Sequence, residues 1–238
     1  MSWWRKLYRR AMTPKPQPSV RLDLAAAHAQ AWAELGRSGA FYTGRQRVEL
    51  VGTALRALDD REPGAPWMGP SRLGSLPDPC LAPAAAHDVV HRVACHAGTI
   101  TDSWYQATVG FIGEVAWVEL VALTATVAAI HSFRRSVGLD PWQLPVASDD
   151  PPTQEIAPDL VVATMNWVPV AAPADVTASV VQAFTALPAE NARTWRLAAV
   201  QYMSDAEMDD PRFSRGVLTR PEMELLALRV AQRRDCFF

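Results

Sequence analysis

The chain has 238 residues, of which 49% are hydrophobic, and its charges nearly balance, with a formal net charge of −2 at pH 7. This length can bury a sizeable core, and the balanced charge argues against a nucleic-acid-binding protein, which would present a basic face. The three cysteines, Cys80, Cys95 and Cys236, are odd in number and widely scattered. A secreted disulfide framework is denser and even in number, so we expect a cytoplasmic protein.

Residues 1–20 form a basic, aromatic segment that lacks the apolar stretch of a secretion signal. On a helix its tryptophans would lie opposite its arginines, so residues 1–12 could rest on an anionic membrane surface. Packing of this helix against the body of the protein is the simpler expectation. No apolar run reaches the ~18 residues of a membrane-spanning helix, because Glu119 interrupts the longest one, residues 115–130.

Helical signals dominate the remaining sequence, since alanine is abundant and long period-two alternation is missing. Gly36 and Gly138 are stop signals, and Thr43 with Gln46 has the spacing of a capping box. Proline-rich connections are expected over residues 61–83 and 141–173. The fold class is therefore predicted to be all-α, with helices over residues 21–35, 43–60, 83–97, 101–109, 114–137, 175–186, 189–203 and 219–238.

Three of the predicted helices share an internal repeat. Each copy contains a glutamate (Glu49, Glu119 or Glu224) followed by Leu, then Val or Leu, then Gly or Ala. A carboxylate inside an apolar helix is costly unless it is paired or protonated, so these glutamates are candidate functional residues. Coincidence among alanine-rich helices is the alternative. The copies are RVELVGTALRAL (47–58), WVELVALTATVAA (117–129) and EMELLALRVAQRR (222–234).

The third copy is followed by a cysteine, because Cys236 comes twelve residues after Glu224. On an unbroken helix this separation is about 18 Å, so the two side chains could not meet. They could meet if the helix ended after Arg234 and another began with Asp235 as its N-cap. Cys236 would then lie in a first helical turn, where the helix dipole and nearby arginines favour the thiolate.

The string LTRPEMELLALRVAQRRDCFF resembles the alkylhydroperoxidase D and carboxymuconolactone decarboxylase family. The family's pattern is Glu, eleven residues, Cys-x-x-Cys, three residues and His, on an all-helical and usually oligomeric bundle. The resemblance implies a dithiol–disulfide cycle that reduces hydroperoxides, with glutamate and histidine relaying the proton of the attacking thiol through water. The whole chain also resembles a two-lobed, peroxidase-related subgroup, some of whose members are selenoproteins.

Carried over residue by residue, the resemblance makes Glu224 the relay glutamate and Cys236 the first cysteine of the pair. The second cysteine and the histidine would fall at positions 239 and 243, beyond Phe238. We therefore expect either a chain cut inside the motif, with selenocysteine at 239 as one form of this, or a degenerate end. In the middle copy Glu119 is kept and His131 takes the cysteine position. The two could form a secondary relay for non-redox chemistry, or His131 merely replaces a lost thiol.

The resemblance also implies an organisation and partners. Related lobes would cover residues 21–145 and 174–238, joined by a linker over 146–173. The substrate would be a hydroperoxide, the electron donor a dithiol protein, and the assembly a homo-oligomer. The sequence shows no flavin or nicotinamide fingerprint, so no cofactor is expected. The alternative is a non-catalytic helical scaffold whose glutamates and histidines sustain the fold and an oligomer interface.

One predicted helix carries a possible metal-binding pattern. His87, His91 and Cys95 follow one another at four-residue intervals and share one helical face. Two such histidines can chelate zinc, and a third ligand one turn later is possible. Histidines on alanine-rich helices often serve in packing instead, so we expect no bound metal. Cys80, between prolines and an apolar helix start, is expected to be a small buried side chain.

Overall fold

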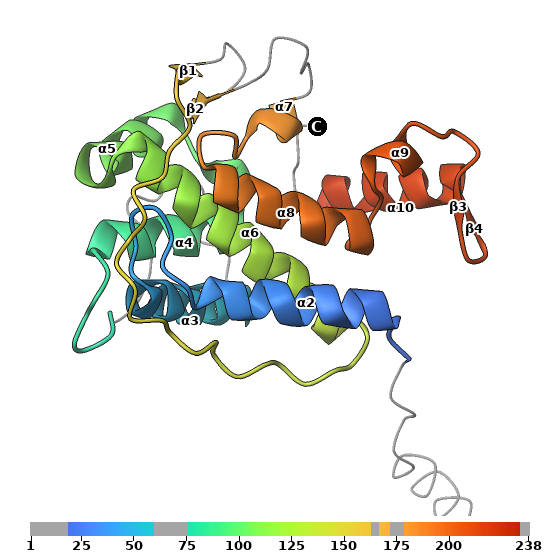
Figure 1. Cartoon of the computed structure of the whole chain (residues 1–238), viewed down its shortest axis with the longest axis horizontal. Helices are drawn as coiled ribbons and strands as arrows, with labels where there is room; N and C mark the ends of the chain where they lie inside the picture. Colours follow the sequence, from blue (N-terminus) through green and yellow to red (C-terminus); the bar gives the residue numbers. More distant parts are fainter. Residues whose placement is uncertain (1–18, 60–75, 163–166, 172–178, 234–238) are drawn as a thin grey trace, which may run out of the picture.

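A computed structural model gives the arrangement of the chain (Figure 1). Several sequence predictions lie outside the residues that it describes: the amphipathic helix within residues 1–18, most of the connection over 61–83, the helix break with Asp235 as N-cap, and the thiol of Cys236. The described residues are 19–59, 76–162, 167–171 and 179–233.

Nine α-helices account for most of the described residues, which confirms the all-α prediction. Two antiparallel pairs of two-residue strands, β1 with β2 and β3 with β4, are the only sheet structure among those residues. The helix predicted over residues 175–186 is described only as the short α7, which turns follow. The helices are α2 (Leu22–Leu35), α3 (Gly44–Asp59), α4 (Ala84–His96), α5 (Asp102–Ile112), α6 (Glu114–Ser136), α7 (Ser179–Gln182), α8 (Pro188–Gln201), α9 (Asp205–Met208) and α10 (Arg220–Arg233). A 3-10 turn, η1 (Ala97–Thr99), follows α4, and the strands are β1 (Val161–Val162), β2 (Pro169–Val170), β3 (Ser214–Arg215) and β4 (Leu218–Thr219).

Two helices begin at the capping signals in the sequence. Before α3, the N–H of Gln46 donates to Thr43 Oγ1 at 3.3 Å, and the N–H of Thr43 donates to Gln46 Oε1 at 3.0 Å. This reciprocal pair is a capping box, as predicted. Before α10, the N–H of Thr219 donates to Glu222 Oε2 at 2.8 Å. Each cap satisfies backbone donors that the first helical turn leaves without partners.

The core forms around α6, which α2, α3, α4 and α8 contact (Figure 1). By length and composition α6 could span a membrane, but 61% of its most apolar stretch is buried inside the chain, as in the core helix of a folded domain. Its interior face packs on the middle of α3 and α4. The fully buried apolar side chains of these three helices include Leu50, Val51, Val89, Val90, Leu120, Leu123, Val127 and Ile130.

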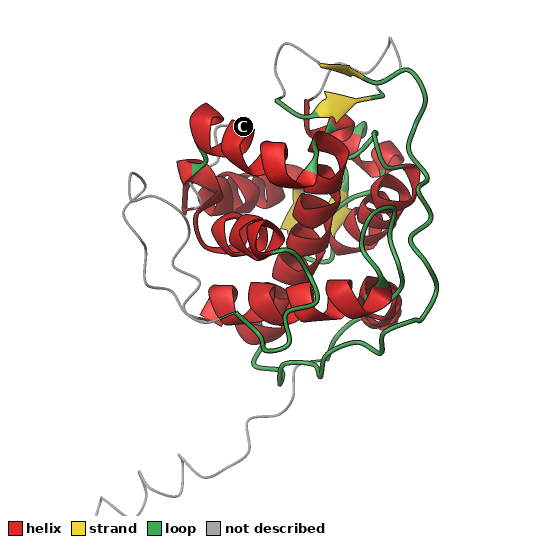
Figure 2. Cartoon of the chain, turned by 90° about the vertical axis from the view of Figure 1, so that its left-hand side faces the viewer, coloured by secondary structure: helices red, strands yellow, loops and turns green. Residues whose placement is uncertain are grey.

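The connection that follows α6 runs along the outside of the helices (Figure 2). Trp32 Nε1 donates to Gln143 O at 2.9 Å, and the N–H of Ser148 donates to Gly36 O at 2.8 Å. A Cβ on Gly36 would lie 2.1 Å from Val146 O, so only glycine permits this close approach. Beyond the connection, α8 returns to the same core and buries Leu197 there. The division into two lobes therefore stays a prediction.

The elements from α9 to α10 lie together at one end of the molecule (Figure 1). Arg220 attaches them to one another, since its Nη1 donates to the carbonyls of Glu207 and Met208 at 3.0 and 3.1 Å. Met223 of α10 is buried, but most of the helix's apolar residues face solvent. The exposed ones are Leu225, Leu226, Leu228 and Val230.

Candidate functional site

Glu224, the predicted relay base, lies on the outside of α10 with 48% of its side chain exposed. Its Oε1 accepts a hydrogen bond from Arg220 Nε at 2.6 Å, and its Oε2 accepts one from the hydroxyl of Tyr202 at 3.2 Å. Burial and the charge of Glu224 raise the pKa of Tyr202, so this hydroxyl stays a donor. Cys236 lies outside the described residues, so its distance from Glu224 stays a prediction.

Glu119, the repeat glutamate of α6, is fully buried in an ion-pair network. Arg47 Nη1 donates to Glu119 Oε1 at 2.6 Å and to Glu190 Oε1 at 2.8 Å, and the N–H of Phe41 donates to Glu119 Oε2 at 2.8 Å. Burial, with the charge of Glu190, raises the pKa of Glu119 despite the opposing effect of Arg47. The network joins α3, α6 and α8, which assigns Glu119 to the scaffold.

The predicted secondary relay needs a break between Glu119 and His131, and α6 has none. The helix is continuous from Glu114 to Ser136, so the two residues are about 18 Å apart along its axis. His131 Nε2 instead lies 3.0 Å from Asp59 Oδ1 at the end of α3. The structure therefore gives each member of the proposed pair a different partner on α3.

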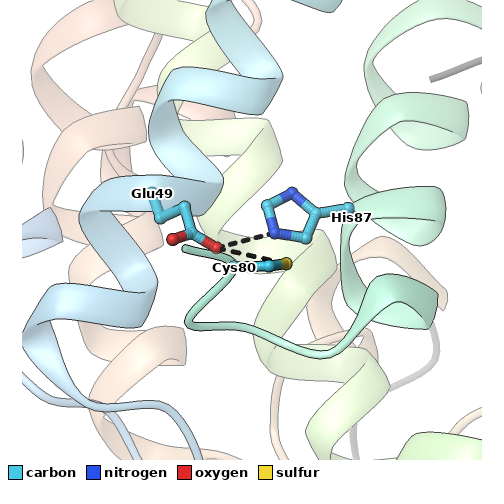
Figure 3. A group of neighbouring side chains, drawn as sticks. All are labelled: Glu49, Cys80 and His87. Atoms are coloured by element: carbon cyan, nitrogen blue, oxygen red, sulfur yellow. Dashed lines mark hydrogen bonds and ion pairs between the residues drawn. The ribbon is translucent and has the colours of Figure 1, made fainter. Parts of the chain in front are cut away.

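A third group, which sequence reasoning did not predict, gathers around the repeat glutamate of α3 (Figure 3). His87 Nε2 lies 2.8 Å from Glu49 Oε1, and Cys80 Sγ lies 3.9 Å from the same oxygen. The three atoms all lie within 4.8 Å of one another, and among the described residues this is the one group with such spacing. His87 is fully buried, the side chain of Glu49 is 10% exposed, and Cys80 is exposed. The group therefore opens to solvent on the side of the thiol.

The Glu49 carboxylate accepts hydrogen bonds from the backbone just before α4. The N–H groups of Leu81 and Ala82 both donate to Glu49 Oε1, at 3.1 and 3.0 Å. Burial alone would raise the pKa of Glu49, but these N–H groups and the His87 ring outweigh it and lower the pKa. Glu49 is thus ionised at neutral pH, and because a carboxylate only accepts, His87 Nε2 carries the proton between them.

The other side of the His87 ring is also held. His87 Nδ1 lies 2.8 Å from the hydroxyl of Thr53, which is buried on α3 and accepts from Arg56 Nη2 at 3.1 Å. Desolvation and the negative charge of Glu49 raise the pKa of Cys80, whose Sγ–H donates to Ala82 O at 3.1 Å. The group thus joins a carboxylate, an oriented imidazole and an accessible thiol that stays protonated.

The alternative of a ligand trio of His87, His91 and Cys95 does not match the structure. His87 Nε2 lies 2.8 Å from Glu49 Oε1, whereas Cys95 Sγ donates at 3.0 Å to Ala57 O, eight residues further along α3, and lies 3.8 Å from His91 Nε2. One sequence expectation about this region changes. The prediction of a buried Cys80 is wrong, because the thiol lies in an exposed turn before α4. A usable signal was the repeat glutamate itself: a carboxylate in a helix interior needs a partner, and His87 provides it.

Comparison of the sequence with protein-family models finds no matching family, and searches of curated proteins and of solved structures find no match.

Proposed function

We propose that the protein reduces hydroperoxides in a thiol cycle in which Cys236 takes part and Glu224 is the base. The observation that carries the proposal is the third repeat, the one copy in which a cysteine follows the glutamate by twelve residues. The environment of Glu224 supports it. This carboxylate is partly open to solvent and bound by Arg220 and Tyr202, so it can exchange protons, whereas Glu119 is buried in the core.

The proposed cycle takes two electrons from thiols. A thiolate attacks one peroxide oxygen, a sulfur–oxygen bond forms, the oxygen–oxygen bond breaks and the alcohol leaves after protonation. Glu224 accepts the thiol proton that is lost at the start and returns it to the leaving oxygen. A second thiol then displaces water from the sulfenic acid and forms a disulfide, which a dithiol reductant protein returns to two thiols. The second thiol, or a selenol in its place, belongs at position 239 by the family pattern.

Consumption of cumene hydroperoxide with dithiothreitol tests the thiol chemistry in a chain extended through position 243, because the cycle needs the second thiol that the family pattern places at 239. We expect turnover, and a dimedone adduct on Cys236 detected by mass spectrometry. Cys236→Ser should abolish both, Glu224→Gln should lower the rate at least tenfold, and Cys95→Ser is the matched control that should change neither. Equal turnover in the wild type and Cys236→Ser would refute the proposal.

The codon after Phe238 tests the selenocysteine form of the motif. An in-frame UGA, followed by an open frame that encodes histidine at position 243, supports that form. A different codon at this place contradicts it, and a cysteine codon there supports the dithiol form.

We also infer that two copies of the chain associate through α10. The repeat strings of α3 and α6 pack against each other, and the matching apolar residues of α10 have no such partner among the described residues. A second α10 offers the same surface, so a two-fold interface would cover the exposed apolar residues of both copies.

Sedimentation should show a dimer that Leu225→Ser/Leu228→Ser converts to a monomer, while Leu22→Ser, on the exposed start of α2, leaves the dimer intact. A monomeric wild type at high concentration would contradict the inference.

A further inference from the structure

We propose that Glu49, Cys80 and His87 bind a divalent transition-metal ion of the zinc type, in a site separate from the proposed redox residues. The three side chains converge from α3, from the turn before α4 and from α4 itself (Figure 3). They supply one carboxylate oxygen, one thiol sulfur and one imidazole nitrogen. Zinc accepts each of these three ligand types, and soft thiolate with imidazole selects zinc-like ions over magnesium or calcium.

The distances fit an ion after small movements. Zinc–ligand bonds of about 2.0–2.3 Å at tetrahedral angles separate the ligand atoms by roughly 3.3–3.7 Å. His87 Nε2 and Glu49 Oε1 are 2.8 Å apart, and Cys80 Sγ is 3.9 Å from that oxygen. An ion therefore needs the first pair to open slightly and the exposed thiol to move inward. Rotation of the exposed Cys80 side chain can bring the thiol inward, and a shift of the Glu49 carboxylate is needed to open the first pair.

The residues around His87 can satisfy its ring nitrogens both without a metal ion and with one bound. When His87 Nε2 binds a metal, its proton must move to Nδ1, which then donates to Thr53 Oγ1, 2.8 Å away. The hydroxyl can accept from Nδ1 and from Arg56 Nη2 while it donates to Glu49 O at 3.4 Å. A hydroxyl has one donor and two acceptor positions, so the Thr53 hydroxyl then uses its full hydrogen-bonding capacity. Metal-binding histidines typically have such a partner on the second nitrogen.

Charge also favours a cation over a reactive free thiol at this place. A thiolate beside the Glu49 carboxylate would be two anions side by side, and no cationic side chain contacts Cys80 Sγ in the described part of the chain. A divalent ion neutralises both, and the proton of the thiol leaves when the metal–sulfur bond forms. Because Cys80 faces solvent, water can take the fourth position. Three protein ligands with one open position are the arrangement of zinc sites that polarise a bound water or substrate.

Cobalt substitution tests the site in the full chain. Protein stripped with a chelator and titrated with Co²⁺ should develop the visible bands of tetrahedral Co²⁺ and a thiolate-to-metal charge-transfer band at one equivalent. Zn²⁺ should displace the cobalt. Cys80→Ser should abolish the charge-transfer band and weaken Zn²⁺ binding at least tenfold, and it leaves the fold in place because Cys80 is exposed. Glu49→Gln should also weaken binding.

Two matched controls make the outcome decisive. Cys95→Ser and Cys236→Ser should keep the band unchanged. A band that survives Cys80→Ser, or that disappears in Cys95→Ser, would overturn the proposal, and the second result would favour the His91–Cys95 side of α4. Absence of stoichiometric Co²⁺ and Zn²⁺ binding in the folded wild type would also overturn it. Peroxide turnover is not part of this readout, so the metal site and the redox proposal can fail independently.

Discussion

The helices α6 and α10 contain closely matching strings, ELVAL at 119–123 and ELLAL at 224–228, and these strings lie in opposite environments. In α6, Leu120 and Leu123 are 0% and 1% exposed, whereas the matching Leu225 and Leu228 of α10 are both 65% exposed. The string makes a helix in both places, because its residues favour helix and its apolar positions fall on one side. The residues that surround this side come from other segments, and five helices contact α6.

The glutamates of the two helices make the comparison sharper. Glu119 and Glu224 each receive a guanidinium nitrogen at 2.6 Å, but Glu119 is fully buried and Glu224 is 48% exposed. At equal distance, solvent screening leaves the exposed pair with little net energy, while a buried pair is sensitive to the loss of either partner. The two ion pairs should therefore differ greatly in their importance for stability and in their ability to exchange protons.

The largest expected effect comes from removing the buried guanidinium. Arg47→Met leaves Glu119 buried without a cation, while Glu190 keeps its bond from Arg193 at 2.6 Å. We expect the free energy of unfolding at pH 7 to fall by about 3–5 kcal/mol. Glu224→Gln removes the charge of the exposed pair and leaves the bonds of Arg220 to the carbonyls of Glu207 and Met208 in place, so it should lower this free energy by at most about 1 kcal/mol. Urea unfolding measures both.

The destabilisation of Arg47→Met also has a predicted pH dependence. Burial raises the pKa of Glu119, and loss of Arg47 raises it further above the value in the unfolded chain. A carboxyl with a raised folded-state pKa destabilises the protein at high pH; this effect shrinks as the pH falls below that pKa and is gone below the pKa of the unfolded chain. The deficit of Arg47→Met relative to wild type should therefore shrink from pH 7.5 to pH 5. A constant deficit would mean that lost packing, and not charge, causes it.

Much of the fold could be predicted from the sequence because its signals are local. Thr43 with Gln46 marks the start of α3, and Gly36 marks the end of α2. The burial of α6 and the exposure of α10 could not be predicted in this way, since both depend on contacts between distant segments.

The same difference between local signals and long-range contacts applies to the candidate sites. The repeat glutamates were found because a carboxylate in an apolar helix is unusual, but their partners come from elsewhere in the chain. Arg47 is 72 positions from Glu119, and His87 is 38 positions from Glu49. Spacing along one helix suggested His87, His91 and Cys95 as a group. The structure instead brings His87 and Cys80 to the same oxygen of Glu49, and Cys80 lies in the segment before α4, where helical periodicity carries no information.

Core packing gives the next largest difference between the two helices. Leu120→Ala removes buried methyl groups and should destabilise the protein by about 2–5 kcal/mol. Leu225→Ala, at the matching position of α10, should change the stability of the monomer by no more than about 0.5 kcal/mol. Unfolding at low protein concentration measures the monomer alone. A large loss in Leu225→Ala under those conditions would mean that α10 packs within its own chain.

The smallest of these effects concerns the space around the buried glutamate, which has no counterpart at α10. A Cβ on Gly39 would lie 2.0 Å from Glu119 Oε1 and 2.6 Å from Arg47 Nη1, so Gly39→Ala must displace the ion pair. We expect a loss of about 1–3 kcal/mol, typical of overpacking. Gly110→Ala is the control, because nothing lies within 4 Å of its Cβ and alanine favours the helix α5 by about 0.5–1 kcal/mol. If Gly39→Ala changed the free energy of unfolding as little as a surface substitution does, the Arg47–Glu119 pair could shift without cost. The buried Glu119 would then not require a glycine in the loop before α3.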